Sequence, residues 1–122
     1  MNGNVVTLIM PPRPTGPVLR EFELMVLLAV LKLGDRAYPL AIGDAIETRT
    51  KRKASRAAVL ITLERLEDKG LLTSRFGDPT PVRGGRAKRI FYPKPLAVRA
   101  VKESLARIEA MADGLEARLN KA

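Results

Sequence analysis

The chain has 122 residues, contains no cysteine, histidine or tryptophan, and carries 22 Lys and Arg residues against 13 Asp and Glu residues. This length is typical of one domain, and because aromatic residues make up only 4% of the chain, aliphatic side chains must form most of the core. The absence of His and Cys excludes an imidazole base, a thiol nucleophile, a disulfide framework and the usual zinc sites. We therefore expect that the protein is not an enzyme and that it binds neither a metal nor a cofactor.

The net charge of +9 is concentrated in one stretch of the chain. Thirteen basic and four acidic residues lie between Arg49 and Lys94, whereas the rest of the chain has nine of each. A one-sided basic surface is what binding to a polyanion requires. The alternative is a solvated surface that only keeps the protein soluble.

The sequence shows no pattern typical of a membrane span or a signal peptide. Its longest apolar run, Leu24 to Leu31, has eight residues, whereas a spanning helix needs about 20. The stretch from Val5 to Met10 has no basic residue before it and leads into prolines. We therefore expect a cytoplasmic protein with no membrane partner.

Two helices are predicted in the first part of the chain. Residues 1–17 contain four prolines and two glycines, which predicts a flexible arm. The first helix, Val18 to Leu33, is apolar on nearly every side, so we expect another helix or a second chain to cover its outer face. The second helix spans Leu40 to Thr48, and its expected buried set is Leu40, Ile42, Ala45 and Ile46.

A basic segment, Arg49 to Arg56, precedes a third helix. Ser55 is a typical N-cap for this helix, which runs through AAVLITLERLEDK and stops at Gly70. Helical spacing predicts an inward stripe of Val59, Leu60, Leu63 and Leu66. The opposite face then carries Ala57, Ala58, Ile61 and Arg65.

After Gly70 the pattern changes to that of a β-hairpin, with strands LLTSRF and RAKRIFY joined by a long tip rich in proline and glycine. Two prolines separate this hairpin from a final helix, Leu96 to Asn120. Its apolar residues follow alternating steps of three and four, as in an a/d seam: Val98, Val101, Leu105, Ile108, Ala112, Leu115 and Leu119. The seam can fold back on the first helix or pair with a second subunit.

These elements predict a mainly α fold with a small β-hairpin, in the order of a winged helix-turn-helix with a C-terminal dimerisation helix. The expected units are residues 1–17 as a flexible N-terminal arm, 18–94 as the winged-helix DNA-binding domain, and 95–122 as the C-terminal dimerisation helix. A helix fits the DNA major groove, and arginines on a protruding ribbon can follow the backbone or enter the minor groove.

Two runs of the sequence resemble the PadR-like family of winged-helix bacterial transcriptional regulators. They are LERLEDKGLL, Leu63 to Leu72, and GGRAKRIFY, Gly84 to Tyr92, which is similar to the family's glycine-arginine-lysine-tyrosine wing signature. Residues 18–119 fit the family's layout of three helices, a wing and a dimerisation helix. The resemblance implies a homodimeric regulator, most simply a repressor, that binds double-stranded DNA and is associated with the bacterial nucleoid.

The chain departs from the family's pattern at three places. Leu60 stands where the third helix usually has a tyrosine, and Tyr38 and Pro39 replace the usual tyrosine-glycine pair of the second helix. The threonine expected after the wing is missing, and Pro93 to Pro95 stand there instead. These departures affect the DNA contacts expected from the resemblance, and they leave the expected fold unchanged.

The candidate DNA-binding residues lie around the third helix and in the wing. Cations beside a helix N-terminus and on the wing are expected to contact phosphates: Lys51, Arg52, Lys53, Arg83, Arg86 and Lys88. The start and outer face of the third helix supply the residues expected to contact bases or nearby phosphates: Ser55, Arg56, Ala57, Ile61 and Arg65. For the apolar members of this face, packing against the hairpin is an equal alternative to contact with a thymine methyl group.

A different class of function also fits a basic winged helix, namely an adaptor that binds a protein or RNA partner, for example in plasmid maintenance or replication. The resemblance also leaves room for a small-molecule effector, since similar regulators respond to aromatic ligands. The chain has only three Phe and two Tyr residues and no Trp. We therefore expect that an effector is either absent or aliphatic.

Overall fold

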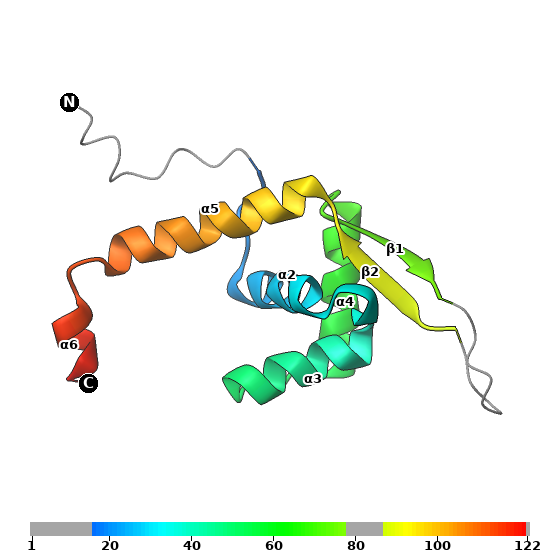
Figure 1. Cartoon of the computed structure of the whole chain (residues 1–122), viewed down its shortest axis with the longest axis horizontal. Helices are drawn as coiled ribbons and strands as arrows, with labels where there is room; N and C mark the ends of the chain where they lie inside the picture. Colours follow the sequence, from blue (N-terminus) through cyan, green and yellow to red (C-terminus); the bar gives the residue numbers. More distant parts are fainter. Residues whose placement is uncertain (1–15, 78–86, 122) are drawn as a thin grey trace.

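The computed structural model describes residues 16–77 and 87–121 (Figure 1). Its elements, in chain order, are α2 (Glu21–Leu33), the 3-10 turn η1 (Gly34–Arg36), α3 (Pro39–Thr50), α4 (Arg56–Asp68), β1 (Leu72–Phe76), β2 (Arg89–Pro93), α5 (Pro95–Ala112) and α6 (Glu116–Asn120). The predicted order of three helices, a hairpin and a C-terminal helical region is confirmed. Most of the predicted N-terminal arm lies outside the described residues.

Helix α2 lies at the centre of the fold, and α3, α4, β2 and α5 all pack against it (Figure 1). Val26, Leu27 and Val30 are almost fully buried. The cover predicted for the outer face of this apolar helix is therefore supplied largely by its own chain. None of the helices within the described ranges is both long and apolar enough to cross a membrane.

A buried carboxylate ties the start of α2 to the end of α4. Glu23 is 2% exposed, accepts a hydrogen bond from the Arg20 backbone N–H at 2.9 Å, and pairs with Lys69 Nζ at 2.9 Å. Burial of this carboxyl raises its pKa, but the Arg20 N–H, the hydrogen bond and charge of Lys69, and the charge of Arg65 outweigh that effect. The pKa of Glu23 therefore lies below its ordinary value of 4.5.

The depressed pKa of Glu23 predicts an acid-dependent loss of stability. A carboxyl whose pKa is lower in the folded state contributes stability that is present above the unfolded pKa and is lost as pH falls through the folded pKa. We expect the melting temperature of the wild type to fall more steeply below about pH 4.5 than that of Glu23→Gln. Thermal unfolding followed by circular dichroism at stepped pH measures this difference.

The matched control is Glu21→Gln on the same helix, because the Glu21 side chain is 77% exposed. It should keep the acid dependence of the wild type. Parallel curves for wild type and Glu23→Gln would show that the carboxylate does not couple the two helices.

Helix α3 begins at Pro39, a residue suited to the first turn of a helix, and buries Ile42 and Ile46 as predicted. The predicted burial of Leu40 is wrong, because its side chain is 50% exposed. Leu40 lies in the first turn of α3 and lines a groove beside α4 and β2, away from the core.

Helix α4 begins as predicted, since Ser55 Oγ accepts a hydrogen bond from the Ala58 N–H at 3.1 Å. The buried stripe differs by one residue from the prediction. Thr62 is 6% exposed and belongs to this stripe together with Val59, Leu63 and Leu66, whereas Leu60 is 37% exposed. The inward placement of Leu60 is therefore wrong: it lies at the edge of the helix that faces the wing.

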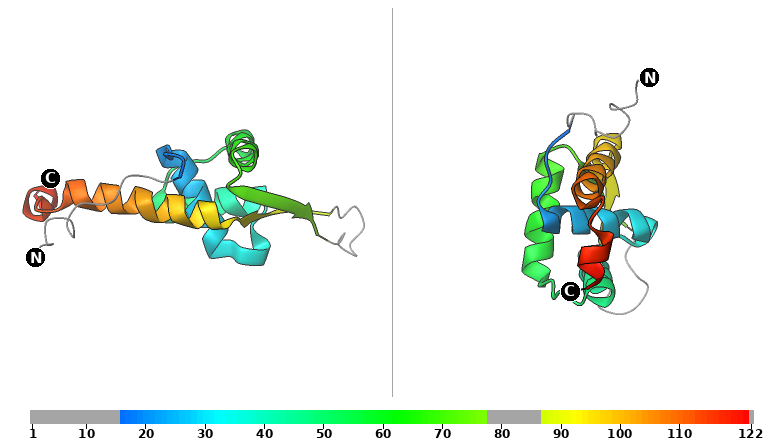
Figure 2. Two further views of the ribbon diagram at one scale, coloured as in Figure 1. Left: turned by 90° about the horizontal axis from the view of Figure 1, so that it is seen from above. Right: turned by 90° about the vertical axis from the view of Figure 1, so that its left-hand side faces the viewer.

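The two strands form the predicted antiparallel hairpin, with Leu72 opposite Pro93 and Phe76 opposite Arg89. Phe91 is fully buried, and its N–H donates to the Ala37 carbonyl oxygen at 2.9 Å. The strands extend away from the helical body on the side opposite to α5 (Figure 2). The predicted tip between the strands lies mostly outside the described residues.

The C-terminal region is not one helix from Leu96 to Asn120, which corrects the prediction. Helix α5 ends at Ala112, and Gly114 adopts a left-handed conformation with φ 86°, so α6 turns away from the axis of α5 (Figure 1). The seam is also interrupted at its start. Val101 is 4% exposed in the core of its own chain and is not available to a second subunit.

Candidate nucleic-acid interface

Nine of the eleven predicted DNA-binding residues belong to the described part of the chain, and all nine are exposed. Arg83 and Arg86 lie outside it. The nine come from the segment between α3 and α4, from the start and outer face of α4, and from the residue before β2: Lys51, Arg52, Lys53, Ser55, Arg56, Ala57, Ile61, Arg65 and Lys88.

Local hydrogen bonds fix the backbone of the basic segment. Lys51 ends α3 in a left-handed conformation with φ 65°, and its N–H donates to the Glu47 carbonyl oxygen at 2.9 Å. Thr50 Oγ1 donates to the Ile46 carbonyl oxygen at 2.7 Å and accepts the Arg52 N–H at 3.1 Å. The segment therefore presents its cations from an ordered turn.

The side chain of Arg52 is directed back toward the start of α2. Its Nη1 lies 3.1 Å from Glu21 Oε1, and its guanidinium carbon lies 4.9 Å from the centroid of the Phe22 ring. Both partners of the ion pair are substantially exposed. An exposed pair contributes about 0–1 kcal/mol, so a phosphate can compete with Glu21 for this guanidinium.

A groove of about 290 Å³ separates α4 from the start of the wing. Its described lining comprises three cations and four apolar or aromatic residues, and no acid: Tyr38, Pro39, Leu40, Arg56, Leu60, Lys88 and Arg89. Lys88 Nζ lies 4.1 Å from the centroid of the Tyr38 ring, a cation–π contact. The groove therefore combines positive charge with apolar walls, which suits a phosphate and its sugar.

Arg89 holds the wing against α4. Its Nη2 lies 2.6 Å from Glu67 Oε1, its Nη1 lies 3.5 Å from Glu64 Oε2, and its Nε donates to Ser74 Oγ at 3.0 Å. Ser74 Oγ in turn donates to Glu67 Oε2 at 2.8 Å. Arg89 is therefore the centre of a polar network, which fixes the angle between the hairpin and α4.

The outer face of α4 is partly apolar. Ile61 is 55% exposed, so packing against the hairpin does not explain it, and Ala57 is exposed too. Leu60 adds apolar surface on the wing side of the same helix. Sequence reasoning missed Leu60, Leu40 and Tyr38 as residues that line the groove between α4 and the wing, because no local signal distinguishes them from core residues.

No known family profile and no curated protein matches this sequence. Among solved structures, a PadR family transcriptional regulator from Eggerthella lenta DSM 2243 superposes with a TM-score of 0.61 at 19% identity, over 80% of this chain and 83% of the other. A complex of hsRosR-S4 superposes with a TM-score of 0.59 at 17% identity, over 84% of each chain. At such identities the likeness concerns the fold, and this chain thus shares the winged-helix fold of a PadR family transcriptional regulator.

Proposed function

We propose that the protein is a homodimeric transcriptional regulator that binds double-stranded DNA in a sequence-specific way and acts as a repressor in the cytoplasm, on the nucleoid. The observation that carries this proposal is the cationic groove between α4 and the wing, beside an exposed and partly apolar helix face. The name of the Eggerthella lenta neighbour, a transcriptional regulator, points in the same direction.

In the proposed complex, α4 enters the major groove. The helix has 13 residues and is therefore about 20 Å long, enough to cross the groove. Arg56, at its start, reaches a base edge or a phosphate, and Ile61 contacts a thymine methyl group. Lys88 and the neighbouring wing follow the sugar-phosphate backbone, and Arg89 keeps the wing at the required angle.

A dimer is proposed because one winged helix buries too little surface for strong specificity, whereas two copies can read the halves of a palindrome. Helices α5 and α6 expose large apolar side chains that a second copy can cover: Val98, Leu105, Ile108, Met111, Leu115 and Leu119. Occupation of a palindromic site by such a dimer blocks access of other proteins to the same DNA, which is the basis of the proposed repression.

The salt dependence of DNA binding tests the proposal. A cation that contacts phosphate contributes about 0.9 to the slope of log affinity against log salt, so Lys88→Ala should flatten the slope by about 1.8 for a dimer. All duplex sequences should be weakened alike. Arg56→Ala is expected instead to cost about 1–3 kcal/mol at a few base positions, with little change in slope where the lost contact is to a base.

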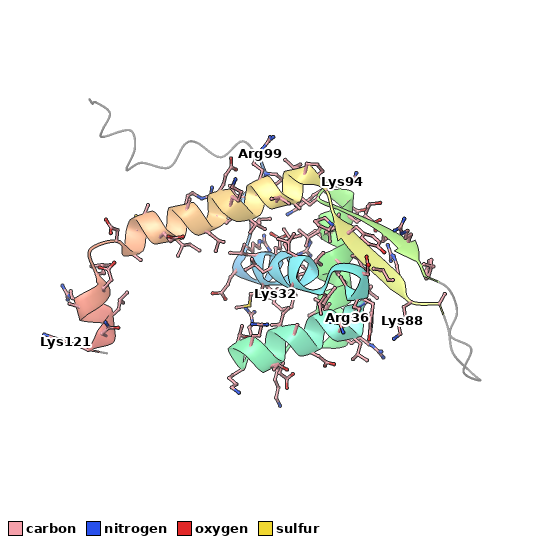
Figure 3. The ribbon with its side chains drawn as sticks, viewed as in Figure 1. Lys32, Arg36, Lys88, Lys94, Arg99 and Lys121 are labelled. Atoms are coloured by element: carbon pink, nitrogen blue, oxygen red, sulfur yellow. The ribbon has the colours of Figure 1, made fainter. Side chains whose placement is uncertain are left out.

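The matched control is Arg99→Ala, which removes one exposed cation from α5, away from α4 and the wing (Figure 3). It should leave affinity and slope near wild type. If Lys88→Ala behaves like Arg99→Ala, the wing is not a DNA element. Preference for RNA or single-stranded DNA over duplex DNA in gel shifts at two salt concentrations would favour the adaptor function instead.

A further inference from the structure

A pocket of about 210 Å³ opens between α2 and α3, within one chain. Its walls are apolar, and its described lining contains neither an aromatic nor an acidic residue. The side chains of Met25, Leu28 and Ala45 line this pocket, where they pack against the core but remain partly exposed. The pocket therefore offers apolar surface that the core of the chain does not cover.

Two cations, Lys32 and Arg49, supply the charge of the pocket, each from the last turn of its helix. Lys32 lies on the side of α2 that faces α3 (Figure 3). Both residues are exposed, and neither forms an ion pair within residues 16–77 and 87–121. The third polar residue, Thr50, is occupied within the chain, because its hydroxyl donates to the Ile46 carbonyl oxygen and accepts the Arg52 N–H.

This lining determines which ligand chemistry fits. Small-molecule sites combine apolar walls with a few polar groups that orient the ligand. Walls without an aromatic ring suit a saturated chain, and cations suit an anionic head group. A carboxylate carries a single charge, so it costs less to bring against apolar walls than a doubly charged phosphate. The volume lies below the range of about 300–1,000 Å³ for drug-sized ligands, so the chain is short.

We propose that this pocket binds a short-chain aliphatic carboxylate and that the bound anion lowers the affinity of the protein for DNA. The second part rests on the proposed function. Arg49 lies in the pocket lining and begins the basic segment that presents Lys51, Arg52 and Lys53. A carboxylate at Arg49 places negative charge beside these cations, which weakens their attraction for phosphate.

Methyl NMR of the full chain locates the ligand, with sodium octanoate as the probe and isotope-labelled methionine methyl groups as reporters. Met25 lines the pocket, whereas Met111 lies on α5, is 80% exposed and serves as the internal reference. Met25→Leu identifies the Met25 signal. Octanoate should shift this signal saturably and leave that of Met111 unchanged. A Met111 shift as large as that of Met25 overturns the proposal, and so does the lack of a saturable Met25 shift, as when a second copy covers the pocket.

Ala45→Leu fills the pocket and tests its shape. Alanine and leucine both favour a helix, so α3 keeps its conformation, which circular dichroism checks. The dissociation constant for octanoate, obtained from the Met25 shift, should rise by about tenfold or more. The matched control is Ala106→Leu at an exposed position of α5, which should leave the constant unchanged. Equal constants for the wild type and Ala45→Leu overturn the proposal.

The double variant Lys32→Gln with Arg49→Gln tests the recognition of the anion and leaves the core intact. The dissociation constant for octanoate should rise by about fivefold, because two exposed charge contacts are lost. Octanol, which has the same chain without the charge, should bind the wild type and this variant alike.

The matched control for the charge is Arg118→Gln with Lys121→Gln, which removes two exposed cations near the C-terminus, away from α2 (Figure 3). It lowers the net charge by the same amount and should keep the wild-type constant. Equal weakening by the two double variants would show that net charge, and not the pocket, attracts octanoate, which overturns the proposal.

The effect on DNA binding tests the second part of the proposal. Saturating octanoate should lower the duplex affinity of the wild type by about threefold or more relative to an equal concentration of sodium chloride, and it should have no such effect on Ala45→Leu. Octanoate that shifts the Met25 signal but leaves DNA affinity unchanged overturns the regulatory part alone. A protein that does not bind DNA without octanoate removes the proposed function, whereas the Met25 titration still decides whether the pocket binds a carboxylate.

Discussion

Phe91→Ala is expected to lower the free energy of unfolding by about 3–5 kcal/mol, which is most of the stability of a small domain. Phe91 is fully buried, and its strand β2 packs against α2 and α5. The loss has two sources. The transfer of an aromatic side chain from water into the core no longer stabilises the fold, and the missing ring leaves a cavity that its neighbours cannot close. Urea unfolding, followed by circular dichroism, measures the change.

Phe76→Ala is the control, because Phe76 lies in the other strand and is 69% exposed. It should lower the free energy of unfolding by less than about 0.5 kcal/mol, as most surface substitutions do. Similar losses for the two variants would mean that the buried face of β2 does not anchor the wing to the helical body.

The double variant Leu105→Asp with Ile108→Asp is expected to convert the proposed dimer to a folded monomer. Both side chains are exposed within one chain, at 38% and 58%, so the fold itself does not require them. In the dimer each aspartate is placed in an apolar contact, where an unpaired charge costs several kcal/mol. Sedimentation equilibrium reports the mass, and circular dichroism reports the fold. Specific DNA affinity should fall, and the salt slope should drop to about half, because half of the phosphate contacts are lost.

Ala106→Asp adds a charge to an exposed position of the same helix that carries no large apolar side chain. It should leave the protein dimeric. A double variant that retains the wild-type mass would place the dimer contact elsewhere on the chain.

Local signals in the sequence predict the order of the elements well. Ser55, Gly70 and the prolines around β2 act through their own backbone preferences, so their effects can be read without knowledge of the fold. The placement of Leu40 and Leu60 cannot be read in this way. Both helices have more apolar residues than one buried face can hold, and tertiary packing decides which of them are left exposed.

Gly114 illustrates a second limit of prediction from the sequence. A glycine within a helical pattern can be tolerated at a cost of about 1 kcal/mol or can end the helix. The heptad spacing of Leu105, Ile108, Leu115 and Leu119 favours the first outcome, and the structure shows the second. The spacing describes the apolar residues on both sides of the bend, and it does not determine whether the backbone between them remains helical.

The cations of the candidate interface could be predicted because they are clustered in the sequence. The contacts that organise them could not, since they join distant positions: Lys88 stacks on Tyr38, and Arg89 pairs with Glu67. Charge alone does not separate a cation available to a ligand from one occupied within the chain. Lys88 and Arg89 are adjacent in sequence, yet Lys88 belongs to the first class and Arg89 to the second.

The network around Arg89 has a consequence for the range of DNA sites that the proposed dimer can accept. Because Arg89 of β2 is held to Glu67 and Glu64 of α4 and also bonds Ser74 of β1, we expect the helix and the hairpin to move as one unit. Variation in the separation of two half-sites is then accommodated by the connection between the two copies. Selection from random duplexes should accordingly recover an invariant sequence within each half-site, and any tolerance should be confined to the length of the spacer between them.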